Sequence, residues 1–209
     1  MSEVLFIGEP GTGKSLMALK FANEYKNIVW ISTTRSSRMV RRFIGRNDVW
    51  IVDTHTWSPI RASARDVIIG NPLNLNEVSL GIGRVLDRIE DKYIVVLDSI
   101  SGLLIYHSVQ RVLHFLRNLL VRIEGDGCGG MFILVKNAHD LNTELSVAFM
   151  FSNIIELSIR IINEKIRRFI RVIKSAEFIE PDFFEFKIEK EGIEIPKNIE
   201  EFIKRQLRY

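Results

Sequence analysis

Residues 8–15 of the chain read Gly8-Glu9-Pro10-Gly11-Thr12-Gly13-Lys14-Ser15. This stretch fits the pattern G-x-x-x-x-G-K-[ST], which is typical of a loop that wraps the phosphates of a nucleoside triphosphate. Glycines let backbone N–H groups approach the phosphates closely, and Lys14 brings a positive charge to the outer ones. The hydroxyl of Ser15 is a candidate ligand of Mg²⁺. We therefore predict a nucleotide site at residues 8–15, with ATP and Mg²⁺ as its cofactors.

The residues on either side of this loop favour the motif over a chance glycine-rich turn. Residues 4–7 form a short apolar run that ends at the loop, as a buried parallel strand does. Residues 16–22 then have the pattern of a helix. Strand, loop and helix follow one another in the order that a phosphate loop of this kind requires.

The rest of the chain alternates between strand-like and helix-like segments. Strands are expected at 3–7, 28–32, 49–53, 66–69, 93–97, 131–135 and 153–159, and helices near 14–25, 36–45, 74–90, 108–124 and 142–150. This alternation predicts an α/β fold with a mostly parallel twisted sheet and helices on both faces. After residue 160, strands at 166–173, 183–188 and 193–195 and a helix at 198–207 predict an antiparallel C-terminal extension. Glu180-Pro181-Asp182 joins the first two of these strands, and residues 1–209 are expected to form a single domain.

Composition narrows the class of protein further. The chain has 209 residues, of which 46% are hydrophobic, so it can bury a large core. Its one cysteine excludes a disulfide framework and a four-thiolate metal site. No apolar run reaches the roughly 20 residues of a membrane span, and we expect a cytoplasmic protein. The many Ile, Arg, Lys and Glu residues beside only two glutamines are typical of proteins from hot environments.

A second nucleotide signal lies in the middle of the chain. Residues 93–98 form an apolar strand that ends in the carboxylate of Asp98. In proteins with a phosphate loop, an aspartate at the end of a buried strand helps to hold Mg²⁺ beside the phosphates. We therefore predict that Ser15 and Asp98 lie together at the metal that accompanies the nucleotide.

These segments resemble the RecA superfamily of P-loop ATPases, and in particular its KaiC-like branch, as an archaeal-type single-domain member. The resemblance rests on GEPGTGKS (8–15), VVLDSISGLLIY (95–106), RRFIRVIK (167–174) and FFEFKIEKEGIEI (183–195). It covers residue 3 to about 196. It implies a mixed eight-stranded RecA-like sheet with ATP at the C-terminal ends of its strands.

The chain departs from this family where hydrolysis is concerned. Most members have one or two glutamates just after the second strand, where this chain has Thr34 and Arg35. Directly after the Mg²⁺ aspartate, where many other ATPases place the base, stands Ser99. The family's Lys-x-Arg, which reaches the phosphates of a neighbouring subunit, keeps Lys174 but loses its arginine. We expect weak hydrolysis, name no catalytic residue, and consider Lys174 a candidate trans contact in a homo-oligomer.

Two further groups of residues are candidates for function. Asn137 and His139 follow the strand at 131–135, where RecA-like proteins sense the γ-phosphate. Arg38, Arg41 and Arg42 are spaced to share one helix face, which is either a patch for a polyanion or an ordinary solvated face.

Two functions stay open from the sequence. The first is an ATP-binding, weakly hydrolysing protein whose nucleotide state regulates its assembly or the binding of a protein partner. The alternative is a DNA-associated recombinase paralogue that modulates DNA repair or recombination, with weak DNA binding through the arginines.

Overall fold

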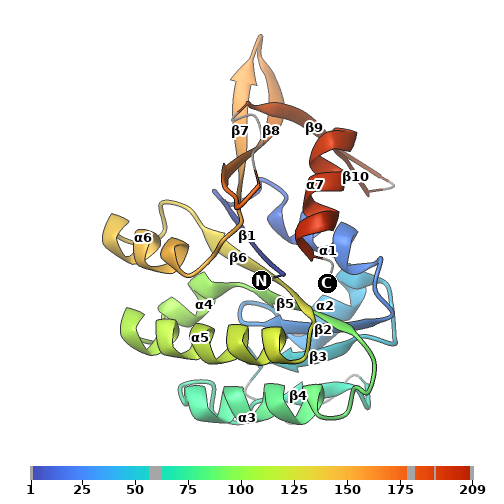
Figure 1. The fold of residues 1–209 in the computed structure, drawn as a ribbon, viewed down its shortest axis with the longest axis vertical. Helices are drawn as coiled ribbons and strands as arrows, with labels where there is room; N and C mark the ends of the chain where they lie inside the picture. The colour runs from blue at the N-terminus through green and yellow to red at the C-terminus, as the bar shows by residue number, and fades with distance from the viewer. Residues whose placement is uncertain (1, 57–62, 178–181, 191, 208–209) are drawn as a thin grey trace.

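A computed structural model describes residues 2–56, 63–177, 182–190 and 192–207 of the chain. In these residues one sheet contains ten strands in the order β10-β9-β8-β7-β1-β6-β5-β2-β3-β4 (Figure 1). The strands are β1 (Glu3–Gly8), β2 (Asn27–Ser32), β3 (Trp50–Asp53), β4 (Asp66–Ile68), β5 (Tyr93–Asp98), β6 (Gly129–Val135), β7 (Ile154–Ile162), β8 (Lys165–Lys174), β9 (Phe184–Glu189) and β10 (Gly192–Glu194). From β7 to β4 all neighbours are parallel, whereas β7, β8, β9 and β10 pair antiparallel.

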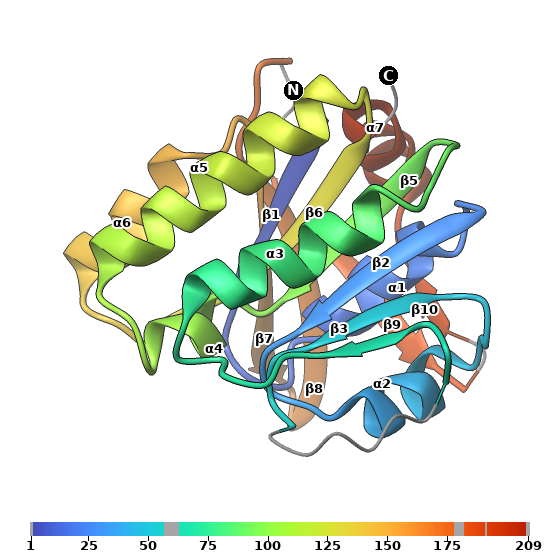
Figure 2. The same ribbon diagram turned by 90° about the horizontal axis from the view of Figure 1, so that it is seen from below.

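The helices form a layer on each face of the sheet (Figure 2). One layer contains α1 (Lys14–Ala22), α2 (Ser37–Ile44) and α7 (Lys197–Leu207), whose apolar residues share one core cluster. The other contains α3 (Leu75–Leu86), α4 (Ile100–Leu104), α5 (Val109–Gly125) and α6 (Leu141–Phe149), which share a second cluster. None of the described helices is long and apolar enough to cross a bilayer.

The central strands have continuous apolar runs because helices cover both faces of the sheet. On β1, Val4 and Phe6 face the first core, and Leu5 and Ile7 face the second. A parallel strand covered on both faces needs apolar residues at every position, because successive side chains point in opposite directions. The run before the phosphate loop is therefore buried over the whole of β1.

The predicted α/β fold with its antiparallel extension is confirmed, with three differences of detail. The sheet has ten strands in the described residues, not the eight that the resemblance implied, and β4 and β10 are three-residue strands at its edges. The five-residue α4 was missed because its length is too short to show a periodic pattern. The helix expected at 74–90 ends at Leu86. Glu180 and Pro181 lie outside the described residues.

Candidate nucleotide site

The predicted phosphate loop joins the C-terminal end of β1 to the first residue of α1. Gly13 caps the helix in the left-handed region, with φ 101°, and makes no side-chain cap hydrogen bond. A Cβ at Gly13 would stand 2.8 Å from Cδ1 of Ile188 on β9, and one at Gly8 would stand 2.2 Å from the carbonyl oxygen of Leu157 on β7. Backbone conformation therefore favours glycine at position 13, and close packing against a backbone oxygen requires it at position 8. A helix N-terminus presented in this way favours an anion.

Lys14 lies inside the loop that it completes. Its Nζ donates to the carbonyl oxygens of Gly8 and Glu9, at 2.7 Å each, and the residue is only 6% exposed. Burial lowers the pKa of Lys14 to about 8, although the charges of Asp98 and Glu9 act in the opposite direction. A buried ammonium group with a lowered pKa has a strong need for a negative partner, which the phosphates of a nucleotide would supply.

The two predicted metal ligands converge on a single atom. Nη2 of Arg35 donates to Oδ2 of Asp98 at 2.7 Å and to Oγ of Ser15 at 3.1 Å. The hydroxyl comes from α1 and the carboxylate from the end of β5, so the fold brings together two oxygens of the kind that Mg²⁺ prefers. The pair therefore fits Mg²⁺. Because the described residues contain no group of three or more His, Cys, Asp or Glu side chains that could hold a metal, phosphate oxygens or water would complete its shell.

Arg35 is the residue at this site that sequence reasoning missed. Arg35 stands at one of the two positions where the resemblance implies a glutamate. Nothing in the sequence pattern shows that its guanidinium reaches Asp98. Two further contacts fix it. Oγ of Ser32 donates to the carbonyl oxygen of Arg35 at 2.6 Å, and the guanidinium carbon lies 4.9 Å from the ring centroid of Phe43.

The end of β2 carries no carboxylate in the structure either. Thr34 is exposed, and Thr33 is buried and tied to Ser99, accepting from its N–H and donating to its carbonyl oxygen at 2.8 Å each. A Cβ at Gly102 of α4 would stand 2.1 Å from Oγ1 of Thr33, so α4 packs tightly against this turn. The Asp98–Ser99 peptide bond is cis.

The two candidate γ-phosphate sensors lie in different surroundings. Nδ2 of Asn137 donates to Oε1 of Glu9 at 3.0 Å, so Asn137 touches the phosphate loop. Nε2 of His139 is buried without a hydrogen-bond partner within the described part of the chain. Of the two, the geometry favours Asn137 as the residue that responds to a ligand in the loop.

An ion cluster that the sequence did not reveal lies next to the loop. Lys136 donates from its backbone N–H to the carbonyl oxygen of Gly8 at 2.9 Å, and its ammonium group is paired with Glu156 of β7. Arg171 of β8 donates to the other oxygen of Glu156 at 2.5 Å. Burial alone would raise the pKa of Glu156, but these two hydrogen bonds hold it below its usual value. The one negative charge of Glu156 is shared by the two cations, so the cluster keeps a net positive charge. Its contacts tie β8 to β7 at the residue that is paired with Ile7 of β1.

Lys174 lies away from this chain's own phosphate loop. It is exposed at the end of β8 and is paired with Ile154 at the start of β7, whereas Gly8 is paired with Leu157. This register places Lys174 at a different level of the sheet from the strand end where the loop begins.

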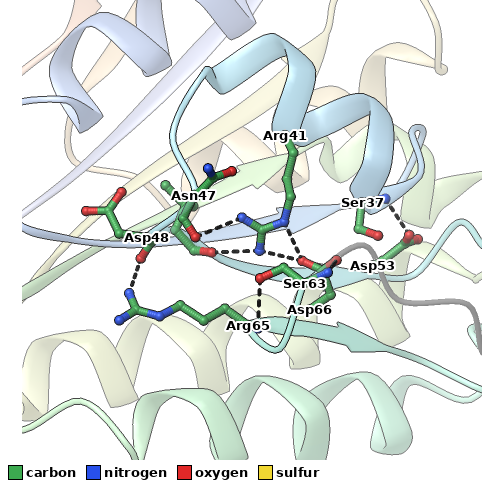
Figure 3. A network of polar contacts seen from close by, with 9 residues as sticks. Ser37, Arg41, Asn47, Asp48, Asp53, Ser63, Arg65 and Asp66 are labelled. Carbon is green, nitrogen blue, oxygen red and sulfur yellow. Dashed lines mark hydrogen bonds and ion pairs between the residues drawn. The ribbon is translucent and has the colours of Figure 1, made fainter.

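The arginines of α2 do not share one exposed face in the way that their spacing predicted. Figure 3 shows that Arg41 points toward Asp66 of β4. Arg41 turns inward, where Nη2 lies 2.5 Å from Oδ1 of Asp66 and also donates to the carbonyl oxygen of Val49 at 3.0 Å. Only Arg38 and Arg42 of the trio are exposed. Arg41 was misplaced because its partner, Asp66, stands 25 residues further along the chain and gives no local signal.

Comparisons with known proteins agree with this geometry. The family model described as "ATPase: KaiC" matches residues 1–200. Among solved structures, a KaiC-like protein from the hyperthermophilic archaeon Pyrococcus horikoshii OT3 matches with a TM-score of 0.70 and 20% sequence identity, over 93% of this chain and 88% of that one. A search of curated proteins returned no match. The chain therefore belongs to the KaiC ATPase family, a nucleotide-binding branch of the RecA-like P-loop proteins.

Proposed function

We propose that this protein binds ATP at residues 8–15 and that the bound nucleotide regulates its assembly or the binding of a partner. The observation that carries the proposal is the enclosure of Lys14 by two loop carbonyls, with Ser15 and Asp98 meeting close by. A desolvated cation at a helix N-terminus is a site for the outer phosphates. When bound, Mg²⁺ neutralises phosphate charge, and Ser15 and Asp98 are the residues that would hold it.

Hydrolysis by this site is proposed to be slow. Phosphoryl transfer depends on positioning, on charge stabilisation and on a group that orients the attacking water. Such a group contributes typically about 10²–10⁴-fold, and neither Thr34 nor Arg35 can act as the carboxylate base. A slowly hydrolysed nucleotide is suited to act as a switch, since the bound state persists long enough to change an interface.

The structure offers a route from the site to a partner. Arg35 immediately precedes the N-cap of α2, so we propose that a change at Asp98 would reach that helix through Arg35. Lys174 remains the candidate for a trans contact if the protein forms a homo-oligomer. We place the protein in the cytoplasm and treat residues 1–209 as one functional unit.

Titration calorimetry tests the central claim. Lys14→Ala should weaken binding of a non-hydrolysable ATP analogue by at least about 100-fold, because it removes the cation of the loop. Lys165→Ala, which removes an exposed lysine at the tip of the β7–β8 hairpin, is the matched control and should bind normally. Unchanged affinity in the Lys14 variant would remove the claim.

The same preparations answer three finer questions. Titration with GTP shows which base is preferred. Steady-state phosphate release by the wild type should fall below the roughly 1–100 s⁻¹ of kinases. Light scattering after size exclusion, with and without nucleotide, shows whether assembly responds.

The DNA-associated alternative rests on a narrower observation. Arg38 and Arg42 are exposed on α2, and no ion pair to either is recorded in the described residues. Two such arginines beside a nucleotide site support weak contact with phosphates of a nucleic acid, not an extended groove.

A further inference from the structure

We propose that Arg35 is an internal competitor of Mg²⁺ for the Ser15–Asp98 pair, so that nucleotide binding by this protein depends little on Mg²⁺. The inference rests on the proposed nucleotide site but goes beyond it. In this inference a side chain of the protein, Arg35, supplies the positive charge beside Asp98 in place of Mg²⁺.

The contacts of Arg35 carry the first step. One nitrogen, Nη2, occupies the point where the hydroxyl of Ser15 and the carboxylate of Asp98 meet, at 3.1 and 2.7 Å. The Asp98 side chain is only 7% exposed, so its charge needs a partner in the folded protein. The guanidinium is that partner in the described structure.

The second step concerns how firmly Arg35 is held. Its carbonyl oxygen accepts from Ser32 at 2.6 Å, and its guanidinium lies over the ring of Phe43. Arg35 is therefore held at its backbone carbonyl, at the face of its guanidinium and at Nη2. A guanidinium held by these contacts is a pre-organised competitor for the carboxylate of Asp98.

The third step is that both cations cannot use these oxygens together. Mg²⁺ binds oxygen ligands at about 2.0–2.1 Å and demands nearly octahedral geometry. A guanidinium hydrogen-bonded to the same carboxylate oxygen stands in the coordination shell and repels the ion through its like charge. Mg²⁺ can bind Oδ2 of Asp98 only after the Arg35 contact is broken.

The fourth step is that Arg35 is chemically able to take over the role of counter-cation. Among the described residues, Nη2 of Arg35 donates both of the hydrogen bonds that its guanidinium makes. Arginine has five N–H donors in a planar fork that matches phosphate geometry, and it stays charged at any pH of interest. Together with Lys14, it supplies two positive charges to the phosphate side of the site.

The test compares nucleotide affinity with saturating Mg²⁺ and with excess EDTA. We expect the two dissociation constants of the wild type to differ by less than about threefold, and those of Arg35→Gln by at least about tenfold, with Mg²⁺ tightening binding. Arg84→Gln is the matched control, because Arg84 is exposed on α3 and its loss should leave the wild-type ratio. Arg35→Lys keeps a charge without the planar fork and should give an intermediate ratio.

A second measurement follows the metal itself. The electron paramagnetic resonance signal of Mn²⁺, with nucleotide present, should show tighter binding to Arg35→Gln than to the wild type. Asp98→Asn in the Arg35→Gln background should abolish that gain, because the gain requires the freed carboxylate. Urea unfolding of each variant shows that the proteins compared are folded.

The outcomes separate this inference from the proposed function. Strong Mg²⁺ dependence in the wild type, equal to that of Arg35→Gln, overturns the role of Arg35 and leaves nucleotide binding in place. Equal Mn²⁺ affinity of the two proteins does the same. Failure of every variant to bind nucleotide under either condition overturns both.

Discussion

Two arginine–aspartate pairs lie on the same side of the sheet, and they serve different ends. Arg35 and Arg41 stand six positions apart on the segment that follows β2. Arg41 reaches Asp66 at the start of β4, whereas Arg35 reaches Asp98 at the end of β5. In open parallel sheets, ligands bind beyond the C-terminal ends of the strands. One pair therefore lies within the framework, and the other lies where a ligand is expected.

Burial and saturation distinguish the two pairs further. The side chains of Arg41 and Asp66 are 9% and 0% exposed, against 29% and 7% for Arg35 and Asp98. Arg41 also donates to the backbone carbonyls of Asn47 and Val49, and so is satisfied entirely within the fold. The guanidinium of Arg35 makes fewer hydrogen bonds than that of Arg41 and is more exposed to solvent. The same two residue types thus form one ion pair that the fold satisfies completely and one that keeps hydrogen-bonding capacity for a ligand.

Breaking the framework pair should have the largest effect. Arg41→Met removes the guanidinium that pairs with the buried carboxylate of Asp66, and we expect a loss of about 3–5 kcal/mol in the free energy of unfolding. Arg35→Met should cost less than this, because the Arg35 side chain is 29% exposed and Lys14 remains near Asp98. Urea denaturation of the two variants measures the difference. Equal losses would show that the contrast between the pairs has no energetic meaning.

The same contrast explains how much the sequence could predict. The phosphate loop and Asp98 follow from local patterns, because their spacing and their place at strand ends are written in a few adjacent residues. Fold class follows from alternating apolar runs. The partners of Arg35 and Arg41 could not be predicted, since each is a long-range contact that depends on how β2, β4 and β5 are placed in the sheet. Helical spacing alone placed Arg41 on the outer face of α2, where it does not lie.

A pH titration sharpens the comparison, because the site contains one cation that can lose its proton and one that cannot. The pKa of Lys14 is lowered to about 8 by burial, so the free protein loses this charge as the pH rises through that value. Nucleotide binding needs the charged form. We therefore expect affinity to be constant just below pH 8 and to fall above it, with a slope that approaches tenfold per pH unit.

Calorimetry between about pH 7.5 and 9.5 measures this profile, in a range where phosphate groups with a pKa near 6 are already ionised. Arg35→Gln should keep the inflection, because arginine does not titrate there. Lys14→Ala should lose it. A wild-type profile that stays flat to the upper limit would mean that the loop does not depress the pKa of Lys14.

The smallest expected effect concerns cations that belong to neither pair. Arg38 and Arg42 are exposed on α2 and take part in neither of the two arginine–aspartate pairs. We expect weak, salt-sensitive DNA binding dominated by phosphate contacts, lost when both residues are changed to Glu. Arg41 stays unchanged in this variant, since its loss would destabilise the fold and hide the result. Fluorescence anisotropy with single- and double-stranded DNA at low and physiological salt is the measurement, and ATP affinity of the same variant should be unaltered. If the wild type shows no binding even at low salt, or the double variant binds as well, these arginines are solvated surface, and the recombinase-type alternative has no remaining support on α2.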